Sequence, residues 1–166
     1  SSLVPFYKDV NILLAKQNCI LVSTTIEGTL INLDAKEIFF SWLSSVRGVD
    51  INVVLTKISK SKYFDDDDLI QYFRVIFNGK SETLVNYKNF RKCNLNNVRS
   101  TKFMNWLEKR TVKNADLAKT DGWVTSFLDY SITYIEKKSL EDNVDFSKLF
   151  SNYFKELYGI ITQLRY

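Results

Sequence analysis

The stretch YFRVIFNGKSETLVNY, residues 72–87, decides the fold expected from the sequence. Two runs rich in apolar and β-branched residues, Tyr72–Phe77 and Thr83–Tyr87, lie on either side of Asn78-Gly79. Asn-Gly suits a type I′ turn, because both residues tolerate positive φ, and such a turn joins two antiparallel strands. The stretch therefore predicts a β-hairpin.

Segments before and after the hairpin predict further strands. Residues 10–33 contain short apolar runs with a turn at Glu27-Gly28, after which Leu30–Leu33 resumes the strand. Asp50–Ile58 is rich in β-branched residues, which is typical of a buried strand. Residues 123–135 permit either two short strands or a single helix, and Val, Thr, Phe, Tyr and Ile favour the strands.

Three segments predict helices. Residues 35–46 carry apolar residues at helical spacing, and Gly48 follows where a C-cap belongs. Ser100 can cap a short helix, and the segment from Phe146 to Leu164 has the strongest amphipathic pattern. The sequence thus predicts one α+β domain, residues 1–166, with a mainly antiparallel sheet, about three helices and a small helical side lobe at about 96–118.

The residue types that are missing exclude most catalytic chemistry. The chain has no histidine, which removes Ser–His and Cys–His pairs, and its five glycines form no phosphate-binding loop. Cys19 and Cys93 are too few for a four-thiolate zinc site and are typical of reduced thiols, with a bridge between them as the alternative. Asp65–Asp68 lacks the spacing of a calcium loop and indicates a solvated loop. We therefore expect no enzyme, no cofactor and no metal site.

The start of the chain lacks the basic lead and apolar core of a signal peptide. Its abrupt beginning indicates a fragment of a longer protein, and its apolar runs are shorter than a membrane span requires.

Positive charge is concentrated in residues 80–113. Nine lysines and arginines stand there against two glutamates, a local charge of +7 in a chain of +4, so the rest carries −3. Aromatic residues are interleaved with these charges. The candidate partner-binding residues are Tyr87, Phe90, Arg91, Lys92, Val98, Arg99, Lys102, Trp106, Lys109 and Arg110. A basic segment with aromatics suits an acidic protein partner or a nucleic acid, and the remaining alternative is that these lysines only solvate the surface.

Two short patterns carry a family resemblance. Thr25–Leu33 (TIEGTLINL) is followed by Trp42 and by Asp66–Ile70 (DDDLI), and Thr120–Val124 (TDGWV) repeats the acidic–glycine–apolar step. These segments resemble the silencing-establishment member of the silent information regulator group, whose domain docks on the origin recognition complex. The resemblance covers mainly residues 20–77.

The resemblance implies a non-catalytic domain that binds the bromo-adjacent homology domain of the largest origin recognition complex subunit. It also implies recruitment of silencing factors to chromatin in the nucleus, and a two-lobed fold whose smaller helical lobe makes the contact. Direct nucleic-acid binding by the basic 80–113 segment is the alternative function. Neither a membrane nor a small-molecule substrate is an expected partner.

Overall fold

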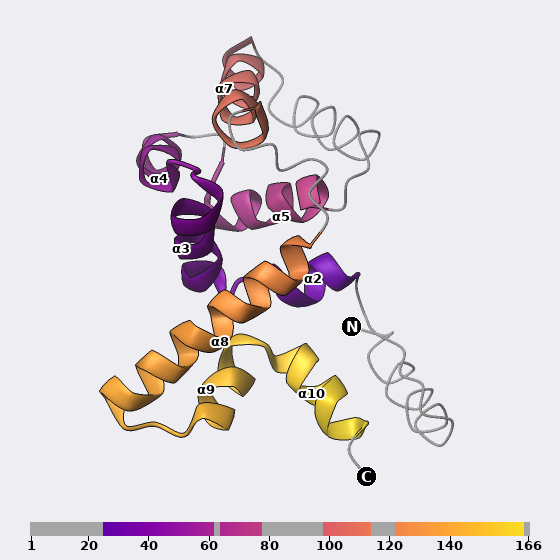
Figure 1. Ribbon diagram of the computed structural model, residues 1–166. Coiled ribbons are helices and arrows are strands. Elements are labelled where there is room, and N and C mark those ends of the chain that lie inside the picture. Colours follow the sequence, from indigo (N-terminus) through magenta and orange to yellow (C-terminus); the bar gives the residue numbers. More distant parts are fainter. Residues whose placement is uncertain (1–24, 62–63, 78–97, 114–121, 165–166) are drawn as a thin grey trace. The chain divides into compact units, whose positions relative to one another are not determined.

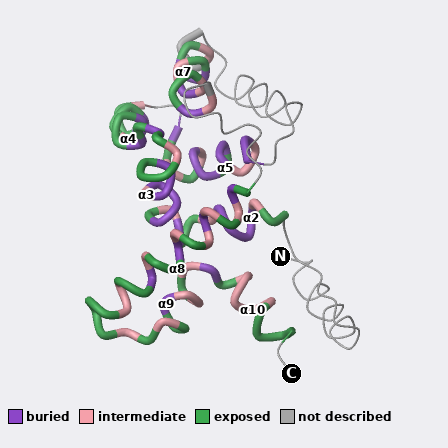
Figure 2. The backbone as a smooth tube through the Cα atoms, in the orientation of Figure 1, coloured by how far each residue is buried: buried purple, intermediate pink, exposed green. Residues whose placement is uncertain are grey.

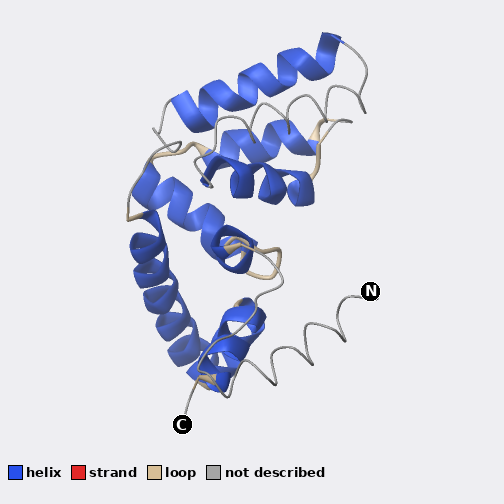
Figure 3. Ribbon diagram, turned by 90° about the vertical axis from the view of Figure 1, so that its right-hand side faces the viewer, coloured by secondary structure: helices blue, strands red, loops and turns tan. Residues whose placement is uncertain are grey.

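A computed structural model describes residues 25–61, 64–77, 98–113 and 122–164 of the 166-residue chain. These residues form helices and a few short connecting segments, and no strand occurs among them (Figure 3). The expected α+β fold with a mainly antiparallel sheet is therefore wrong. The helices are α2 (Ile26–Leu30), α3 (Lys36–Arg47), α4 (Ile51–Ser59), α5 (Asp66–Phe77), α7 (Val98–Glu108), the π-helical turn η1 (Lys109–Lys113), α8 (Trp123–Asp142), α9 (Phe146–Tyr153) and α10 (Lys155–Gln163) (Figure 1).

The chain divides into two compact units. One unit runs continuously from Lys36 to Tyr134, and the other combines the residues up to Ala35 with those from Ile135 onward. The predictions of a single domain and of a helical side lobe at 96–118 stay predictions.

The hairpin prediction fails first at Tyr72–Phe77, which is the second half of helix α5. The four aspartates before this run explain the helix. Asp65 accepts a hydrogen bond from the Asp68 backbone N–H at 2.8 Å, and Asp68 accepts one in return from Asp65 at 3.2 Å. This reciprocal pair caps the helix start, and three acidic residues in the first turn complement the helix dipole. The rest of the expected hairpin, residues 78–87, lies outside the described residues.

The expected strand Asp50–Ile58 is helix α4. The Asp50 carboxylate accepts a hydrogen bond from the Val53 N–H at 3.3 Å and caps the helix. The buried residues Ile51, Val54 and Ile58 recur at helical spacing. Burial of this stripe outweighs the weak preference of β-branched residues for strands.

The strands expected at Leu30–Leu33 and at 123–135 are also wrong. Thr25 caps α2, because its hydroxyl accepts the Gly28 N–H at 3.3 Å, so the Glu27-Gly28 step lies inside a helix. Residues 123–135 belong to α8, the alternative that the sequence left open. Helix α8 ends at Asp142, and Asn143 after it has a φ of 50°. The Val144 N–H donates to the Ser139 carbonyl at 3.2 Å, as is usual where a helix ends in a left-handed residue. Strands expected before residue 25 lie outside the described residues.

Two helix predictions are confirmed and one is partly wrong. Helix α3 matches the expected 35–46 segment, and Gly48 follows it with a φ of +65°. The short helix with Phe103 and Trp106 is α7, which begins at Val98 rather than at Ser100. The expected single helix from Phe146 to Leu164 is split into α9 and α10 at Phe154, whose φ and ψ are −129° and 60°.

An aromatic cluster forms the core of the continuous unit. The ring centroids of Phe39 and Trp42 in α3 lie 5.5 Å and 5.3 Å from that of Phe127 in α8. The ring centroid of Phe77 in α5 lies 4.9 Å from that of Trp123. Such ring pairs contribute about 0.5–1.5 kcal/mol each beyond the area that they bury. Figure 2 shows the buried residues of α3 and α5 alternating with exposed ones at helical spacing. This core holds α3, α5 and the first part of α8 against one another.

The discontinuous unit is built around α2, α9 and α10. Leu30, Ile31 and Phe154 are fully or almost fully buried, and α10 contacts both α2 and α9. Lys155 pairs with Asp34 at 3.2 Å.

Candidate functional site

The predicted binding residues of α7 and η1 share one side of the helix. Lys102 and Trp106 are one turn apart, and Lys109 and Arg110 follow a turn later. Residues three and four apart are neighbours on a helix surface. Lys102, Lys109 and Arg110 are exposed and Trp106 is half-buried. We name these four residues the α7 face.

The opposite side of α7 anchors this face to the core. Phe103, Met104 and Leu107 are buried, and the Phe103 ring lies 5.7 Å from Phe64. In η1 the fully buried Thr111 hydroxyl bonds the Tyr72 hydroxyl at 3.1 Å and donates to the Leu107 carbonyl at 2.8 Å. The π-helical turn is thereby fixed against α5, and the two basic residues before Thr111 extend from an anchored backbone.

Lys57 of α4 adds a fourth cation to this surface. Its ammonium lies 5.8 Å from the centroid of the Trp106 ring, within the range of a cation–π interaction. The Trp106 ring also lies 6.0 Å from Phe103. Trp106 is therefore held between an apolar ring and a cation, with part of its surface open to solvent.

Sequence reasoning missed Lys57 because it assigned residues 50–58 to a strand and sought the site only within residues 80–113. An amphipathic reading of α4 would have placed Lys57 on the exposed side of a helix, although its neighbour Trp106 could not have been deduced. We name Lys57 together with the α7 face the basic surface.

The remaining predicted site residues are not placed by the structure. Tyr87, Phe90, Arg91 and Lys92 lie outside the described residues. Val98 and Arg99 belong to the first turn of α7, but only their helical backbone is described.

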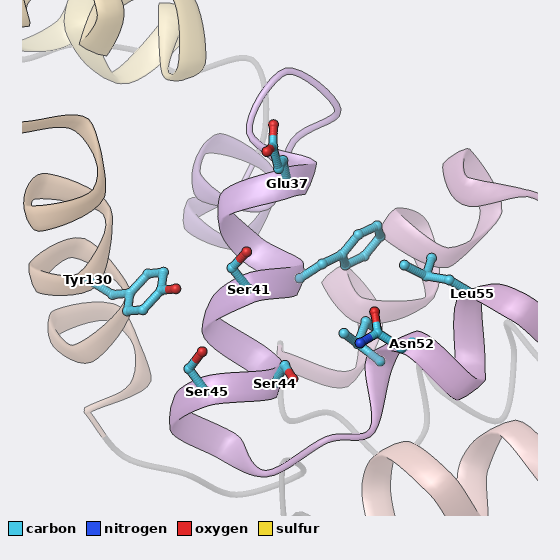
Figure 4. A pocket seen from close by; sticks show the side chains of 9 residues that line it. Glu37, Ser41, Ser44, Ser45, Asn52, Leu55 and Tyr130 are labelled. Carbon is cyan, nitrogen blue, oxygen red and sulfur yellow. The ribbon is translucent and has the colours of Figure 1, made fainter. Parts of the chain in front are cut away.

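A second feature of the continuous unit is a groove of about 370 Å³, which lies between α3 and α4 (Figure 4). Its volume falls at the lower end of the range of ligand pockets. Helix α3 contributes Glu37, Phe40 and three serines, α4 contributes Ile51, Asn52 and Leu55, and α8 contributes Tyr130. The sequence analysis did not identify this groove. Its signal was the polar stripe of Glu37, Ser41, Ser44 and Ser45 at helical spacing, which can be recognised only when a neighbouring helix is known.

The acidic run Asp65–Asp68 serves the fold. Asp65 and Asp68 cap α5, and Asp66 pairs with Lys36 of α3 at 3.3 Å. Within the described ranges, no three Asp, Glu or Cys side chains converge to a metal-ligating cluster. None of the helices that the structure describes is both long enough and apolar enough to cross a membrane.

No protein-family model matches the chain, and no solved structure matches it.

Proposed function

We propose that this chain is a non-catalytic protein-interaction domain that binds an acidic surface of a partner protein through its basic surface. The observation that carries the proposal is Trp106, a large half-buried aromatic residue in contact with Lys57 and surrounded along its helix by Lys102, Lys109 and Arg110. Trp and Arg are enriched among the residues that dominate binding energy at protein interfaces. Basic residues around such an anchor favour an acidic partner by electrostatic complementarity.

The candidate partner is the bromo-adjacent homology domain of the largest origin recognition complex subunit. This choice is supported by the resemblance of residues 25–33, 66–70 and 120–124 to the silent information regulator group. In this proposal the chain acts at chromatin in the nucleus, where it helps to recruit silencing factors.

Binding of the purified bromo-adjacent homology domain to the immobilised chain tests this proposal. Trp106→Ala should weaken binding by roughly 30-fold, which corresponds to a hot spot of about 2 kcal/mol. The double charge reversal Lys109→Glu/Arg110→Glu should slow association, most strongly at low salt. Lys148→Glu, a reversal at an exposed lysine of α9 in the other unit, is the matched control and should leave binding unchanged.

The outcome that contradicts the named partner is no binding at tens of micromolar. If the wild-type chain binds but Trp106→Ala and Lys109→Glu/Arg110→Glu bind as strongly as the wild type, the basic surface is not the interface.

A nucleic acid is the second candidate partner, favoured by the same combination of cations and a half-buried aromatic ring that is partly open to solvent. If Lys57, Lys102, Lys109 and Arg110 each contacted a phosphate of duplex DNA, log K would fall against log salt with a slope of about −3.6. A fluorescence titration with duplex DNA at several salt concentrations measures this slope. A slope near zero, or no binding at low salt, would eliminate this candidate.

A further inference from the structure

The groove between α3 and α4 has an apolar floor. Phe40 and Ile51 are 7% and 4% exposed, and Leu55 beside them is half-buried. These side chains present hydrocarbon at the bottom of a groove that is open to solvent. Such a floor suits the methylene stem of a long side chain, which can lie along apolar surface while its polar head stays hydrated.

The walls of the groove are hydroxyl and amide groups. Ser41, Ser44 and Ser45 come from α3, and Asn52 comes from α4. Figure 4 shows the Tyr130 ring of α8 extending toward the serine-bearing side of α3. These groups can donate to and accept from the main chain of a bound peptide, because each hydroxyl and amide has both capacities.

Three hydroxyls on other helices show how a helical serine or threonine can be satisfied within the chain. Thr111, Ser131 and Thr162 each donate to the backbone carbonyl four residues earlier, at 2.7–3.0 Å. A helical serine or threonine commonly satisfies its hydroxyl in this way. Within the part of the chain that the structure describes, the side-chain hydroxyls of Ser41, Ser44 and Ser45 make no hydrogen bond. Their hydroxyls retain their full bonding capacity for a ligand.

One charge lines the groove. Of its nine lining residues, Glu37 alone is charged, and its carboxylate is exposed. Among the described residues Glu37 forms no ion pair, in contrast to its neighbour Lys36, which pairs with Asp66. An acidic ligand would be repelled by Glu37, whereas a guanidinium or ammonium group at this end of the groove would be attracted.

We propose that this groove binds an arginine or lysine side chain of a partner polypeptide. The stem of that side chain lies on Phe40, Ile51 and Leu55, its cationic head pairs with Glu37, and its main chain bonds the serine and asparagine walls. The choice of a cation rests on the complementary charge of Glu37. The choice of a peptide rests on the hydroxyl and amide walls, which can both donate to and accept from a main chain.

The groove is separate from the basic surface. Asn52 and Lys57 lie five positions apart on α4, so they point in directions about 140° apart around the helix axis. The groove therefore selects a basic residue, whereas the basic surface selects acidic ones. A failure of the proposed function leaves this inference intact, because the two sites use different residues.

Chemical-shift titration of the whole ¹⁵N-labelled chain tests the inference. The probes are the peptide acetyl-Gly-Arg-Gly-amide, its neutral analogue with citrulline in place of arginine, and propylguanidinium, which is the arginine side chain without a main chain. We expect the arginine peptide to shift the amides of Ser41, Ser44 and Asn52. The citrulline peptide should bind about two- to fivefold more weakly, as befits the loss of one solvent-exposed ion pair. Propylguanidinium should bind more weakly than the arginine peptide.

Two glutamate-to-glutamine variants test whether Glu37 causes the preference for arginine. Glu37→Gln should abolish the preference for arginine over citrulline, whereas Glu136→Gln, at an exposed glutamate of α8 outside the groove, should preserve it. The inference is overturned if wild-type protein binds both peptides equally, if the preference survives Glu37→Gln, or if the shifts map to other residues. Equal affinity for propylguanidinium and the arginine peptide would overturn the assignment to a polypeptide.

Discussion

The hydrogen bond between Trp42 and Ser126 allows one prediction to be worked out in full. The Trp42 indole is fully buried in the aromatic cluster, and its N–H donates to the Ser126 hydroxyl of α8 at 3.1 Å. Ser126→Ala removes this acceptor and leaves the indole N–H buried without it. An unsatisfied buried donor costs about 1–3 kcal/mol. Alanine returns up to about 0.5 kcal/mol because it favours the helix more than serine does. The free energy of unfolding should therefore fall by about 0.5–2.5 kcal/mol.

Urea unfolding followed by tryptophan fluorescence is the assay for Ser126→Ala. All three tryptophans, Trp42, Trp106 and Trp123, belong to the Lys36–Tyr134 unit, so their emission reports on that unit. With a slope of about 2 kcal/mol per M, the midpoint should fall by roughly 0.3–1.2 M.

Ser44→Ala is the matched control, because Ser44 is also helical but is exposed, and its side chain makes no hydrogen bond with the described residues. This variant has the same gain in helix propensity as Ser126→Ala, but it does not remove a hydrogen bond. If the two variants unfold at the same urea concentration, the Trp42–Ser126 bond does not stabilise the core and the reasoning is refuted.

Three further predictions concern helix ends and the discontinuous unit. Gly48→Ala should lower the free energy of unfolding in urea by about 1–2 kcal/mol, because the φ of Gly48 is +65° although there is open space for a Cβ. Gly159→Ala, inside α10 and with equally open space, should instead raise the unfolding free energy by about 1 kcal/mol. If both variants changed the unfolding free energy in the same direction, the conformational argument would be contradicted. Asp65→Ala should lower the unfolding free energy by about 0.5–2 kcal/mol through loss of the α5 cap, and an unchanged urea midpoint would show that the cap is dispensable. Phe154→Ala should destabilise the discontinuous unit by about 3–5 kcal/mol, because the ring is fully buried. This unit contains no tryptophan, so its unfolding is followed by far-UV circular dichroism. A loss below about 1 kcal/mol would contradict the burial of Phe154.

Local signals predicted some helices correctly and misled at others. Helix α3 was predictable because its buried residues follow a 3.6-residue period and Gly48 ends it with a positive φ. The same period is present in α5, where Leu69, Phe73 and Ile76 are buried, but the run Tyr72–Phe77 taken alone is apolar or aromatic at every position except Arg74. A short apolar run does not distinguish a strand from a buried helix. The deciding evidence was the cap formed by Asp65 and Asp68, which the sequence analysis assigned to a loop.

The candidate site was predictable only in part. The concentration of charge in residues 80–113 identified Lys102, Trp106, Lys109 and Arg110, and the helix places these four on one face. Lys57 could not be found in this way, because its position over the Trp106 ring depends on how α4 packs beside α7. The groove depends on the packing of α3 against α4, and both of its walls are ordinary polar helix surface when each helix is considered alone.

The division of the chain into a continuous and a discontinuous unit has a consequence for the order of synthesis. All segments of the Lys36–Tyr134 unit are synthesised before α9 and α10, so this unit needs no later segment in order to fold. The other unit combines α2 with α9 and α10, so it can close only after α10 has been translated. A nascent chain stalled shortly after α8 would therefore contain the residues of both the basic surface and the groove before the unit that includes Phe154 exists.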